Sequence, residues 1–327
     1  MVNILVTGGA GYIGSHACKA LRKANFVPVV FDNFSNGWRE ATKFGPLVEG
    51  ELLSQEDLRK AFQEYTPAAV MHFGALTQVG ESVIQPEIYW HNNLVGSLNL
   101  FKTALEFSCK NIVFSSTCAT YGNQDSVVLT EDSLQHPINA YGASKRAVEE
   151  LLSQFETAYG MRSVIFRYFN VAGADPEAEV GEFHQPETHL IPLILRAIQT
   201  KRDPITLHGT DYDTPDGTCI RDYVHVSDLV DAHVLGLEWL LDGKPSNTFN
   251  LGTGHGFSVR EVIEAAGRVT GQPVPIKEGP RRAGDCRKLV SGSERAQNEL
   301  GWDASRSTLD QIIADAWRWQ MSPQYKT

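Results

Sequence analysis

The chain has 327 residues, of which 42% are hydrophobic and 21% are charged. This composition is typical of a globular protein, and the length predicts about two domains. With 39 acidic and 29 basic side chains the net charge is −10, which argues against nucleic acid or an anionic membrane as a partner. No apolar run reaches the roughly 18 residues that a membrane span needs.

The location of the protein is predicted from its two simplest features. The opening MVNILVTGG leads directly into a strand pattern without a charged leader, and the five cysteines are odd in number, widely spaced and free of any CxxC pair. Reduced thiols suit an intracellular compartment better than a disulfide framework does. We therefore expect a soluble, cytoplasmic protein.

The first half of the chain alternates strand-like and helix-like segments. Apolar runs rich in Val, Ile and Phe cover residues 2–7, 27–32, 68–73, 111–116 and 162–167. Such runs, separated by amphipathic stretches, indicate a parallel sheet covered by helices on both faces. The predicted fold class is α/β, with a Rossmann-type doubly wound parallel sheet.

The second half has a looser pattern that begins with a polar segment near residue 170. It predicts strands at ITLHG and NTFNLG and helices around 190–200, 227–241, 258–269 and 308–319. We expect two domains, 1–172 for nucleotide binding and a smaller C-terminal α/β domain, 173–327, for the substrate. The segment of about 220–250 is a candidate to return to the first domain.

A glycine-rich turn, TGGAGYIGSH, follows the first strand and contains Gly8, Gly11 and Gly14. Glycines let backbone N–H groups approach a pyrophosphate at the start of the following helix. The second strand ends at Asp32, where a carboxylate can bind the adenosine ribose hydroxyls and would repel a 2′-phosphate. This arrangement predicts a dinucleotide site that favours NAD over NADP.

A tyrosine and a lysine, Tyr141 and Lys145, occupy positions i and i+4 of the segment YGASK. On a helix they lie on one face, one turn apart. A free phenol has a pKa of about 10, too high for a general base at neutral pH. A nearby ammonium group favours the phenolate, so the pair is a candidate for proton transfer.

These motifs make the sequence similar to the extended short-chain dehydrogenase/reductases, and within them to the UDP-glucose (UDP-galactose) 4-epimerases. The resemblance covers nearly the whole chain. Besides the glycine turn and YGASK it includes DNFSNG (32–37), VGES (79–82), RYFN (167–170), DGTCIRDYVHVSDL (216–229), FNLGTG (249–254) and PRRAGD (280–285). The motif at 216–229, followed about sixty residues later by R-x-G-D, is much more specific than the glycine turn and YGASK, which the whole superfamily shares.

The resemblance implies that NAD is tightly held and that Thr117, Tyr141 and Lys145 are catalytic. Tyr141 is the implied base for the sugar 4-hydroxyl, Lys145 lowers its pKa and holds the nicotinamide ribose, and Thr117 bridges Tyr141 and the substrate. The implied cofactor-binding residues, besides these three, are Gly8, Gly11, Tyr12, Ile13, Gly14, Asp32, Asn33, Phe34, Ser35, Asn36, Gly37, Glu51, Leu52, Phe73, Gly74, Ala75, Leu76, Thr77, Asn92 and Phe169. Relatives often carry Asp in place of Glu51 and Lys in place of Thr77.

The resemblance also implies a UDP-hexose as substrate. Besides Thr117 and Tyr141, the implied substrate-binding residues are Asn170, His189, Leu190, Thr206, Leu207, His208, Arg221, Arg282, Asp285 and Leu289. Arg221 and Arg282 match diphosphate-binding arginines and Asp285 a ribose-binding acid; an ion pair of Arg221 with Asp222 is the structural alternative. His189 departs from the Asn of many relatives. Leu289 is intermediate between the bulky Tyr and the small Cys found beside the sugar.

Several alternatives stay open on the sequence alone. A nucleotide-sugar dehydratase needs acid–base groups for C5 and the 6-hydroxyl, usually Asp-Glu after the strand-end hydroxyl, whereas here Cys118 and Ala119 follow Thr117. A non-enzymatic NAD sensor would not need the Tyr141–Lys145 pair. UDP-N-acetylhexosamines and UDP-pentoses remain possible substrates, and the direction of the reaction and its pathway stay open.

Three further expectations concern metals, thiols and assembly. The ten histidines show no HxH or HxxxH pair, so we expect no metal site. Cys118 has no neighbouring base in the sequence and is expected to pack as a small buried residue, and Tyr121 is expected to be structural or to line the pocket. By resemblance the protein is a homodimer, for which helices at 86–107 and 140–158 are available.

Overall fold

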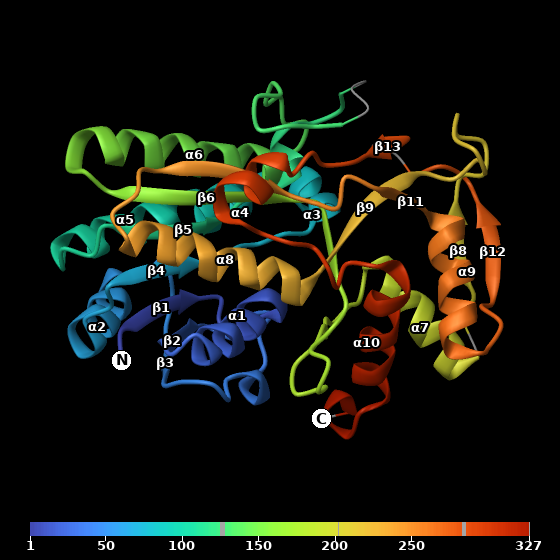
Figure 1. Cartoon of the computed structure of the whole chain (residues 1–327), viewed down its shortest axis with the longest axis horizontal. Coiled ribbons are helices and arrows are strands. Elements are labelled where there is room, and N and C mark those ends of the chain that lie inside the picture. Colours follow the sequence, from blue (N-terminus) through green and yellow to red (C-terminus); the bar gives the residue numbers. More distant parts are fainter. Residues whose placement is uncertain (125–127, 202, 283–285, 327) are drawn as a thin grey trace.

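The computed structural model describes residues 1–124, 128–201, 203–282 and 286–326. Its centre is a seven-stranded parallel sheet in the order β10-β6-β5-β4-β1-β2-β3 (Figure 1). The strands are β1 (Asn3–Thr7), β2 (Val27–Asp32), β3 (Leu47–Glu49), β4 (Ala69–His72), β5 (Asn111–Ser115), β6 (Arg162–Tyr168) and β10 (Asn247–Leu251). The predicted Rossmann-type α/β fold class is confirmed.

Helices cover both faces of this sheet, which explains why its strands are apolar without alternation. On one face lie α1 (Tyr12–Lys23) and α8 (Val226–Leu241), packed against each other and against the strands. On the other face lie α2 (Gln55–Tyr65), α5 (Gly96–Glu106) and α6 (Ala140–Tyr159). Each fully buried Val, Leu, Ile or Phe in these two layers contributes about 1.5–3 kcal/mol.

The order of the strands determines where a ligand can bind. From β1 the chain proceeds to β2 and β3 on one side, and to β4, β5 and β6 on the other. The carboxyl ends of the parallel strands share one edge of the sheet, and the crevice beside β1 and β4 is the topological switch point. The glycine turn after β1 and the ends of β2, β4 and β5 therefore lie at this crevice.

The second half of the chain builds a smaller layered unit around its own apolar core. Strands β7 (Asn170–Ala172), β9 (Ile220–His225), β11 (Gly256–Ser258) and β13 (Lys288–Leu289) form one sheet, and β8 (Ile205–His208) pairs with β12 (Ile276–Gly279). Helices α7 (Leu190–Thr200), α9 (Val259–Thr270) and α10 (Leu309–Met321) supply the core. These helices match the predicted ranges to within two residues.

The places of β9 and β10 determine how the two halves of the chain are connected. The segment NTFNLG lies at the end of the stretch of about 220–250 that is a candidate to return to the first domain, and as β10 it pairs in parallel with β6 and extends the first sheet. The segment IRDYVH carried no strand prediction, yet as β9 it is central to the second sheet. Strand β10 is preceded by α8, which packs on α1, so the chain crosses from the second unit back to the first at about residue 226.

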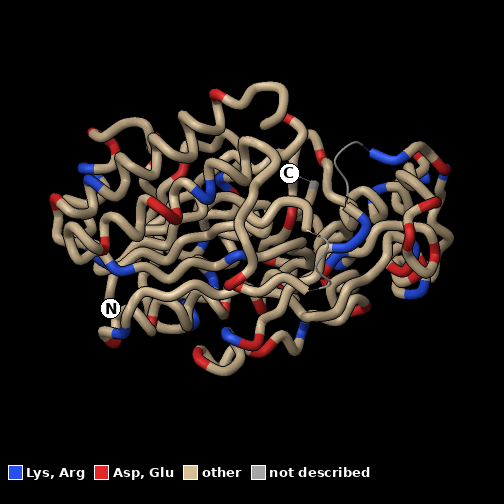
Figure 2. Tube along the Cα trace, turned by 90° about the horizontal axis from the view of Figure 1, so that it is seen from above, with Lys and Arg blue, Asp and Glu red and all other residues tan. Residues whose placement is uncertain are grey.

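The remaining elements are short. They comprise α3 (Val79–Ile84), α4 (Pro86–Tyr89), π-helical turns at Trp90–Val95 and Ala296–Leu300, and 3₁₀ turns at Arg39–Ala41, Cys118–Thr120 and Pro323–Lys326. Among the described residues no helix has the length and apolar character to cross a membrane. Acidic and basic positions are interspersed along the trace in Figure 2.

Candidate active site

The glycine turn after β1 fits a bound pyrophosphate. Gly8 has a φ of +69°, and a Cβ there would lie 2.7 Å from the backbone nitrogen of Gly74. A Cβ on Gly14 would lie 2.1 Å from the carbonyl oxygen of Gly8, so the turn closes tightly on α1. No side chain caps α1 at Gly11, which leaves the helix N-terminus available to an anion.

Asp32, at the end of β2, is held by the turn that it faces. Its Oδ2 accepts a hydrogen bond of 2.9 Å from the Ala10 backbone nitrogen, and its Oδ1 accepts one of 2.8 Å from that of Phe34. Burial raises the pKa of the Asp32 carboxyl, and these backbone donors oppose the rise. A carboxylate fixed in this way, with accepting lone pairs left over, suits the two hydroxyls of a ribose.

Most of the other predicted cofactor residues lie in segments that follow the carboxyl ends of the parallel strands. Tyr12 Oη donates to the Gly173 carbonyl at 2.7 Å, and Asn33 donates to Glu51 Oε2 at 3.0 Å. The loop after β4 contains Phe73, Gly74, Ala75, Leu76 and Thr77. The rest lie in α1, in the loop after β2, beside β3, in the π-helical turn and after β6; they are Ile13, Ser35, Asn36, Gly37, Leu52, Asn92 and Phe169.

The segment that follows β5 brings Thr117 to Tyr141. Helix α6 begins after Asn139, whose Oδ1 accepts from the Gly142 nitrogen at 2.8 Å, and this cap places Tyr141 in the first turn. Burial raises the pKa of the Tyr141 phenol to about 12, and its hydrogen bond with the Thr117 side chain opposes the rise. A further positive charge is therefore needed before Tyr141 can act as a base near neutral pH.

Lys145 is placed one helical turn after Tyr141, with 3% of its surface exposed. Its ammonium lies 4.7 Å from the centre of the Phe114 ring, a cation–π contact. Burial lowers the pKa of Lys145 to about 7, and the Glu149 carboxylate opposes the fall. In the protein without cofactor, both members of the pair are therefore driven toward their neutral forms.

A buried ion pair supports the helix beneath Lys145. Glu149 pairs with Arg167 of β6 at 2.6 Å and accepts a hydrogen bond from Ser116 at 2.5 Å. Arg167 also donates to the phenol of Tyr121, which in turn donates to Asn250 at 2.6 Å. Tyr121 is therefore a structural residue, which was one of the two roles expected for it.

The thiol of Cys118 takes no part in this network. Burial raises its pKa to about 12, so the thiolate that a nucleophile requires is not formed near neutral pH. The residue lies in the 3₁₀ turn that Thr117 caps through its own hydroxyl, at 3.1 Å from the Ala119 nitrogen. The hydroxyl of Thr117, rather than the thiol, is the polar group that reaches Tyr141.

Sequence reasoning missed Asn93, the buried member of the π-helical turn. Its Oδ1 accepts from the Leu76 nitrogen at 2.8 Å, and its amide donates to the Leu76 carbonyl at 3.0 Å and to Ser144 Oγ at 3.1 Å. One side chain thus joins the loop after β4 to α6. In the sequence the available signal was the pair of adjacent asparagines, Asn92 and Asn93. π-helical turns have no characteristic amino-acid composition by which they could be predicted.

Three predicted substrate residues lie on neighbouring strands of the second sheet. Asn170 opens β7 and donates to the Asp222 carbonyl at 3.2 Å. Leu289 is the register partner of Arg221, on β13 and β9 respectively. The Arg221 guanidinium donates to the carbonyls of Ile220 and Cys286 at 2.9 and 2.8 Å. The Asp222 carboxylate instead accepts from Thr253, Gly254 and Ser291.

The remaining predicted substrate residues lie around this sheet. Thr206, Leu207 and His208 belong to β8, and Arg282 is exposed after β12. Leu190 opens α7 directly after His189, whose ring nitrogen Nδ1 contacts Glu182 and Glu187, each at 2.9 Å. Asp285 lies outside the described residues.

A doubly wound sheet with a glycine turn and a terminal carboxylate at its switch point defines a dinucleotide-binding protein of the Rossmann type. A model of the NAD dependent epimerase/dehydratase family matches residues 4–252. The chain is 48% identical over 316 residues to the UDP-glucose 4-epimerase of Rhizobium leguminosarum bv. trifolii, covering 97% of this chain and 96% of that one.

Two solved structures have the same fold over almost their full lengths. UDP-glucose 4-epimerase from Brucella ovis in complex with NAD is 45% identical, with a TM-score of 0.95 and coverage of 97% of this chain and 98% of that one. The enzyme from Bifidobacterium longum in complex with NAD+ and UDP is 34% identical, with a TM-score of 0.93 and coverage of 100% of both chains. The chain belongs to the NAD dependent epimerase/dehydratase family, and NAD is its cofactor.

Proposed function

We propose that the protein interconverts UDP-glucose and UDP-galactose by reversible epimerisation at C4 of the hexose, through a transient 4-keto sugar. The observation that carries this proposal is the composition of the site around Tyr141. It offers a hydroxyl from Thr117 and an ammonium from Lys145, and Cys118 and Ala119 place no carboxylate after Thr117. A dehydratase needs acid–base groups there, whereas epimerisation needs only one group to move the 4-hydroxyl proton.

The side chains divide the work as follows. Bound NAD supplies reversible hydride acceptance at C4. Tyr141 takes the proton of the 4-hydroxyl as a phenolate, and Lys145 stabilises that phenolate by its charge. Thr117 bridges the phenol and the sugar oxygen through its hydroxyl. When the ketone has turned in the pocket, the hydride would be returned to the opposite face of C4, and Tyr141 gives the proton back to the 4-oxygen.

The nucleotide part of the substrate would be held by the second sheet. Arg221 and Arg282 would bind the diphosphate, because guanidinium groups make paired contacts to phosphate oxygens. Leu289, the register partner of Arg221, and Asn170, the register partner of Tyr223, would contact the sugar, with Leu289 limiting the size of the substituent at C2. His189, Leu190 and residues 206–208 are proposed for the uridine side, and Asp285 for its ribose.

The test is an assay in which purified protein receives UDP-galactose and no added NAD, with the product sugar identified by NMR. We expect UDP-glucose to form until both sugars coexist at equilibrium. A 4-keto-6-deoxy sugar would instead indicate a dehydratase. If no product forms although the protein carries NAD, the proposal fails in favour of a cofactor-binding sensor.

The organisation of the chain is also proposed. We propose a nucleotide-binding domain of residues 1–172, to which α8 and β10 return, and a substrate domain formed by most of 173–327. We also propose a cytoplasmic homodimer that uses the helical segments 86–107 and 140–158. In its support, Ile84 is 79% exposed, and the apolar Trp90 and Val95 are also exposed beside α5, a pattern typical of an association surface. Sedimentation analysis would measure the mass of the assembly.

A further inference from the structure

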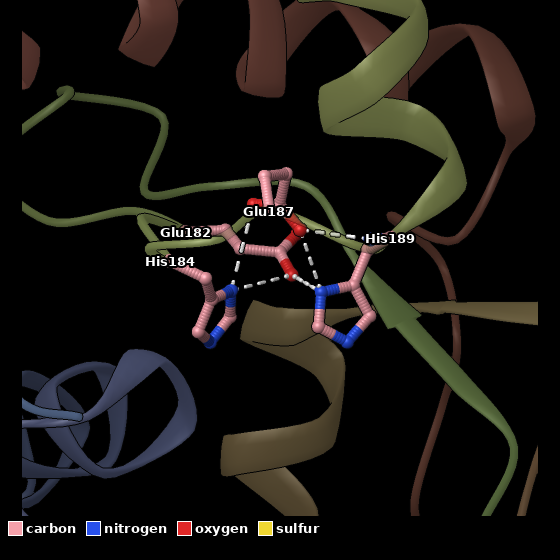
Figure 3. A group of neighbouring side chains, drawn as sticks. All are labelled: Glu182, His184, Glu187 and His189. Atoms are coloured by element: carbon pink, nitrogen blue, oxygen red, sulfur yellow. Dashed lines mark hydrogen bonds and ion pairs between the residues drawn. The ribbon is translucent and has the colours of Figure 1, made fainter. Parts of the chain in front are cut away.

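Two glutamates and two histidines converge in the segment before α7 (Figure 3). Glu182, His184, Glu187 and His189 each contribute one atom to a group whose members all lie within 4.8 Å of one another. Both histidines present Nδ1 to the two carboxylates. None of these side chains belongs to the hydride-transfer machinery around Tyr141.

The contacts of His184 have the spacing of ligands around one ion, whereas those of His189 have hydrogen-bond lengths and would have to widen when an ion binds. Tetrahedral zinc holds nitrogen and oxygen at about 2.0–2.2 Å, so neighbouring ligand atoms stand about 3.4 Å apart. Here Nδ1 of His184 lies 3.4 Å from Glu182 Oε1 and 3.5 Å from Glu187 Oε2. Nδ1 of His189 lies 2.9 Å from Glu182 Oε1 and 2.9 Å from Glu187 Oε1.

In this cluster Nδ1 of His184 faces two carboxylates without a well-formed hydrogen bond to either of them. Among the atoms of the described residues, Nδ1 of His184 is buried and has no hydrogen-bond partner of ordinary geometry. Such an atom in a native interior calls for an explanation. Despite burial, which lowers the pKa of an imidazole, the two carboxylates raise the pKa of His184 to about 9 and that of His189 to about 10 without an ion, so protons on the two rings balance the acids. A cation between the four side chains would replace these protons and give Nδ1 of His184 a ligand bond, beside carboxylates that are 7% and 4% exposed.

The backbone around the cluster is fixed before any ion binds. Glu187 Oε1 accepts from the Thr188 and His189 backbone nitrogens at 2.7 and 2.8 Å. The Glu182 carbonyl accepts from Trp319 Nε1 at 3.0 Å, and the Phe183 carbonyl accepts from Trp38 Nε1 at 2.9 Å. Metal sites depend on such outer contacts, which orient the ligands.

A second group of acids in the same loop provides a contrast. Asp175, Glu177 and Glu179 also lie close enough to share an ion. The ammonium of Lys19 already occupies their centre, at 2.8, 2.5 and 2.6 Å from the three carboxylates. The centre of that group is therefore occupied by a cation of the protein itself, and the group contains no nitrogen ligand.

We propose that Glu182, His184, Glu187 and His189 form a structural site for a divalent transition-metal ion of the zinc class. The ligand set of two imidazoles and two carboxylates suits Zn²⁺, and Co²⁺ would substitute for it in the same geometry. With four protein ligands the site is closed, so its role is to fix the loop that leads into α7. The proposed function also assigns His189 to the uridine side of the substrate, so the metal site would adjoin the nucleotide pocket, but none of its four ligands takes part in the proposed hydride and proton transfer.

The decisive experiment uses the full-length protein without a histidine tag, treated with EDTA and freed of chelator. Isothermal titration with ZnCl₂ is expected to show about one Zn²⁺ per chain. Loading with Co²⁺ is expected to give the intense visible absorption of a tetrahedral site. The double variant His184→Gln/His189→Gln is expected to weaken zinc binding at least about 100-fold, since even outer contacts are worth 10–100-fold.

Two control variants show whether binding is specific to the cluster. His136→Gln removes an exposed histidine elsewhere, and Glu177→Gln alters the group around Lys19; both should bind zinc like the wild type. The proposal is overturned if the EDTA-treated wild type takes up no zinc, or if the double variant binds it with unchanged affinity. Because the readout is binding, a failed epimerase assay would not affect it.

Discussion

The amide of Asn93 donates a hydrogen bond of 3.1 Å to the hydroxyl of Ser144, and both groups are buried. Ser144 precedes Lys145 in α6, and the other contacts of Asn93 hold Leu76 in the loop after β4. One side chain, Asn93, thus fixes both helix α6 and the loop after β4. Asn93 itself is not one of the residues proposed for proton transfer.

Replacement of Asn93 tests this role. Asn93→Ala leaves the Leu76 backbone groups unsatisfied, which is expected to lower the free energy of unfolding by about 1–3 kcal/mol. Turnover should fall as well, and NAD should be released more readily during gel filtration. Asn298→Ala, at an exposed position, is the matched control. Unchanged cofactor retention in Asn93→Ala would contradict the positioning role.

Removal of the phenol hydroxyl tests the general base. Tyr141→Phe keeps the aromatic ring and is expected to retain NAD while turnover of UDP-galactose falls about 10²–10⁴-fold. Thr117→Val removes only the bridging hydroxyl and should cost less. Initial rates together with the NAD content of the denatured protein would measure both effects. A Tyr141→Phe variant within a few-fold of the wild type would rule out the assigned role.

The buried ammonium of Lys145 predicts a pH-dependent cost in stability. In the unfolded chain the lysine keeps its proton to about pH 10.4, whereas in the folded protein without NAD its pKa is about 7. The unfolded state therefore binds more protons between these values, and wild-type stability gains as the pH rises through that window. Below pH 7 the cost of burial is fully present.

Lys145→Met removes this cost. In NAD-free protein it is expected to raise the free energy of unfolding by a few kcal/mol at pH 6.5 and by much less at pH 9.5, measured by urea denaturation. Activity should nevertheless be lost, because the phenolate of Tyr141 loses its counter-charge. The exposed Lys60→Met is the control, and an equal gain at both pH values would argue against the assignment.

Asp32 is predicted to set both affinity and selectivity for the cofactor. The Asp32 carboxylate accepts hydrogen bonds from the backbone N–H groups of Ala10 and Phe34. In Asp32→Asn the amide NH₂ would place a donor against one of these donors, and the negative charge that repels a 2′-phosphate is lost. The affinity for NAD should fall about 10–100-fold, and the affinities for NAD and NADP should become more nearly equal. Fluorescence titration with both reduced cofactors measures this, with exposed Glu49→Gln as control.

The size of Leu289 predicts substrate range. It stands beside Arg221 in the second sheet, and its side chain is larger than the Cys and smaller than the Tyr expected from the family. We expect kcat/KM to favour UDP-galactose over UDP-N-acetylgalactosamine, and Leu289→Cys to narrow that preference. A wild-type ratio near one would show that this position does not restrict the sugar.

Most of the first sheet could be predicted from sequence, because buried parallel strands are continuous apolar runs and α1 follows a recognisable glycine turn. Strand β3 could not, since Leu47–Glu49 is a three-residue edge strand without a pattern. Strand β9 contains Arg221 and Asp222 within IRDYVH. These adjacent charges interrupt the apolar pattern by which a buried strand is predicted. The second sheet depends on contacts between distant segments, and these have no local signal.

The same reasoning applies to the site. Gly8, Asp32, Tyr141 and Lys145 belong to motifs with fixed spacing, so their positions follow from local structure. The cluster around Glu182 does not, because its residues alternate as E-x-H-x-x-E-x-H along an irregular segment. HxH and HxxxH are the spacings that place two histidines on one face of a strand or a helix. His184 and His189 are five residues apart, so neither spacing predicts this cluster.

The return of β10 to the first sheet has a consequence for biosynthesis. Strand β6 is flanked by β5 on one side and by β10 on the other, yet β10 is translated only after the entire segment 169–246. Until then a nascent chain presents β6 as an open edge, and its apolar face still lacks α8. Exposed edges of this kind promote misassembly, so the nucleotide-binding layer of this protein is completed late, when about three quarters of the chain has left the ribosome.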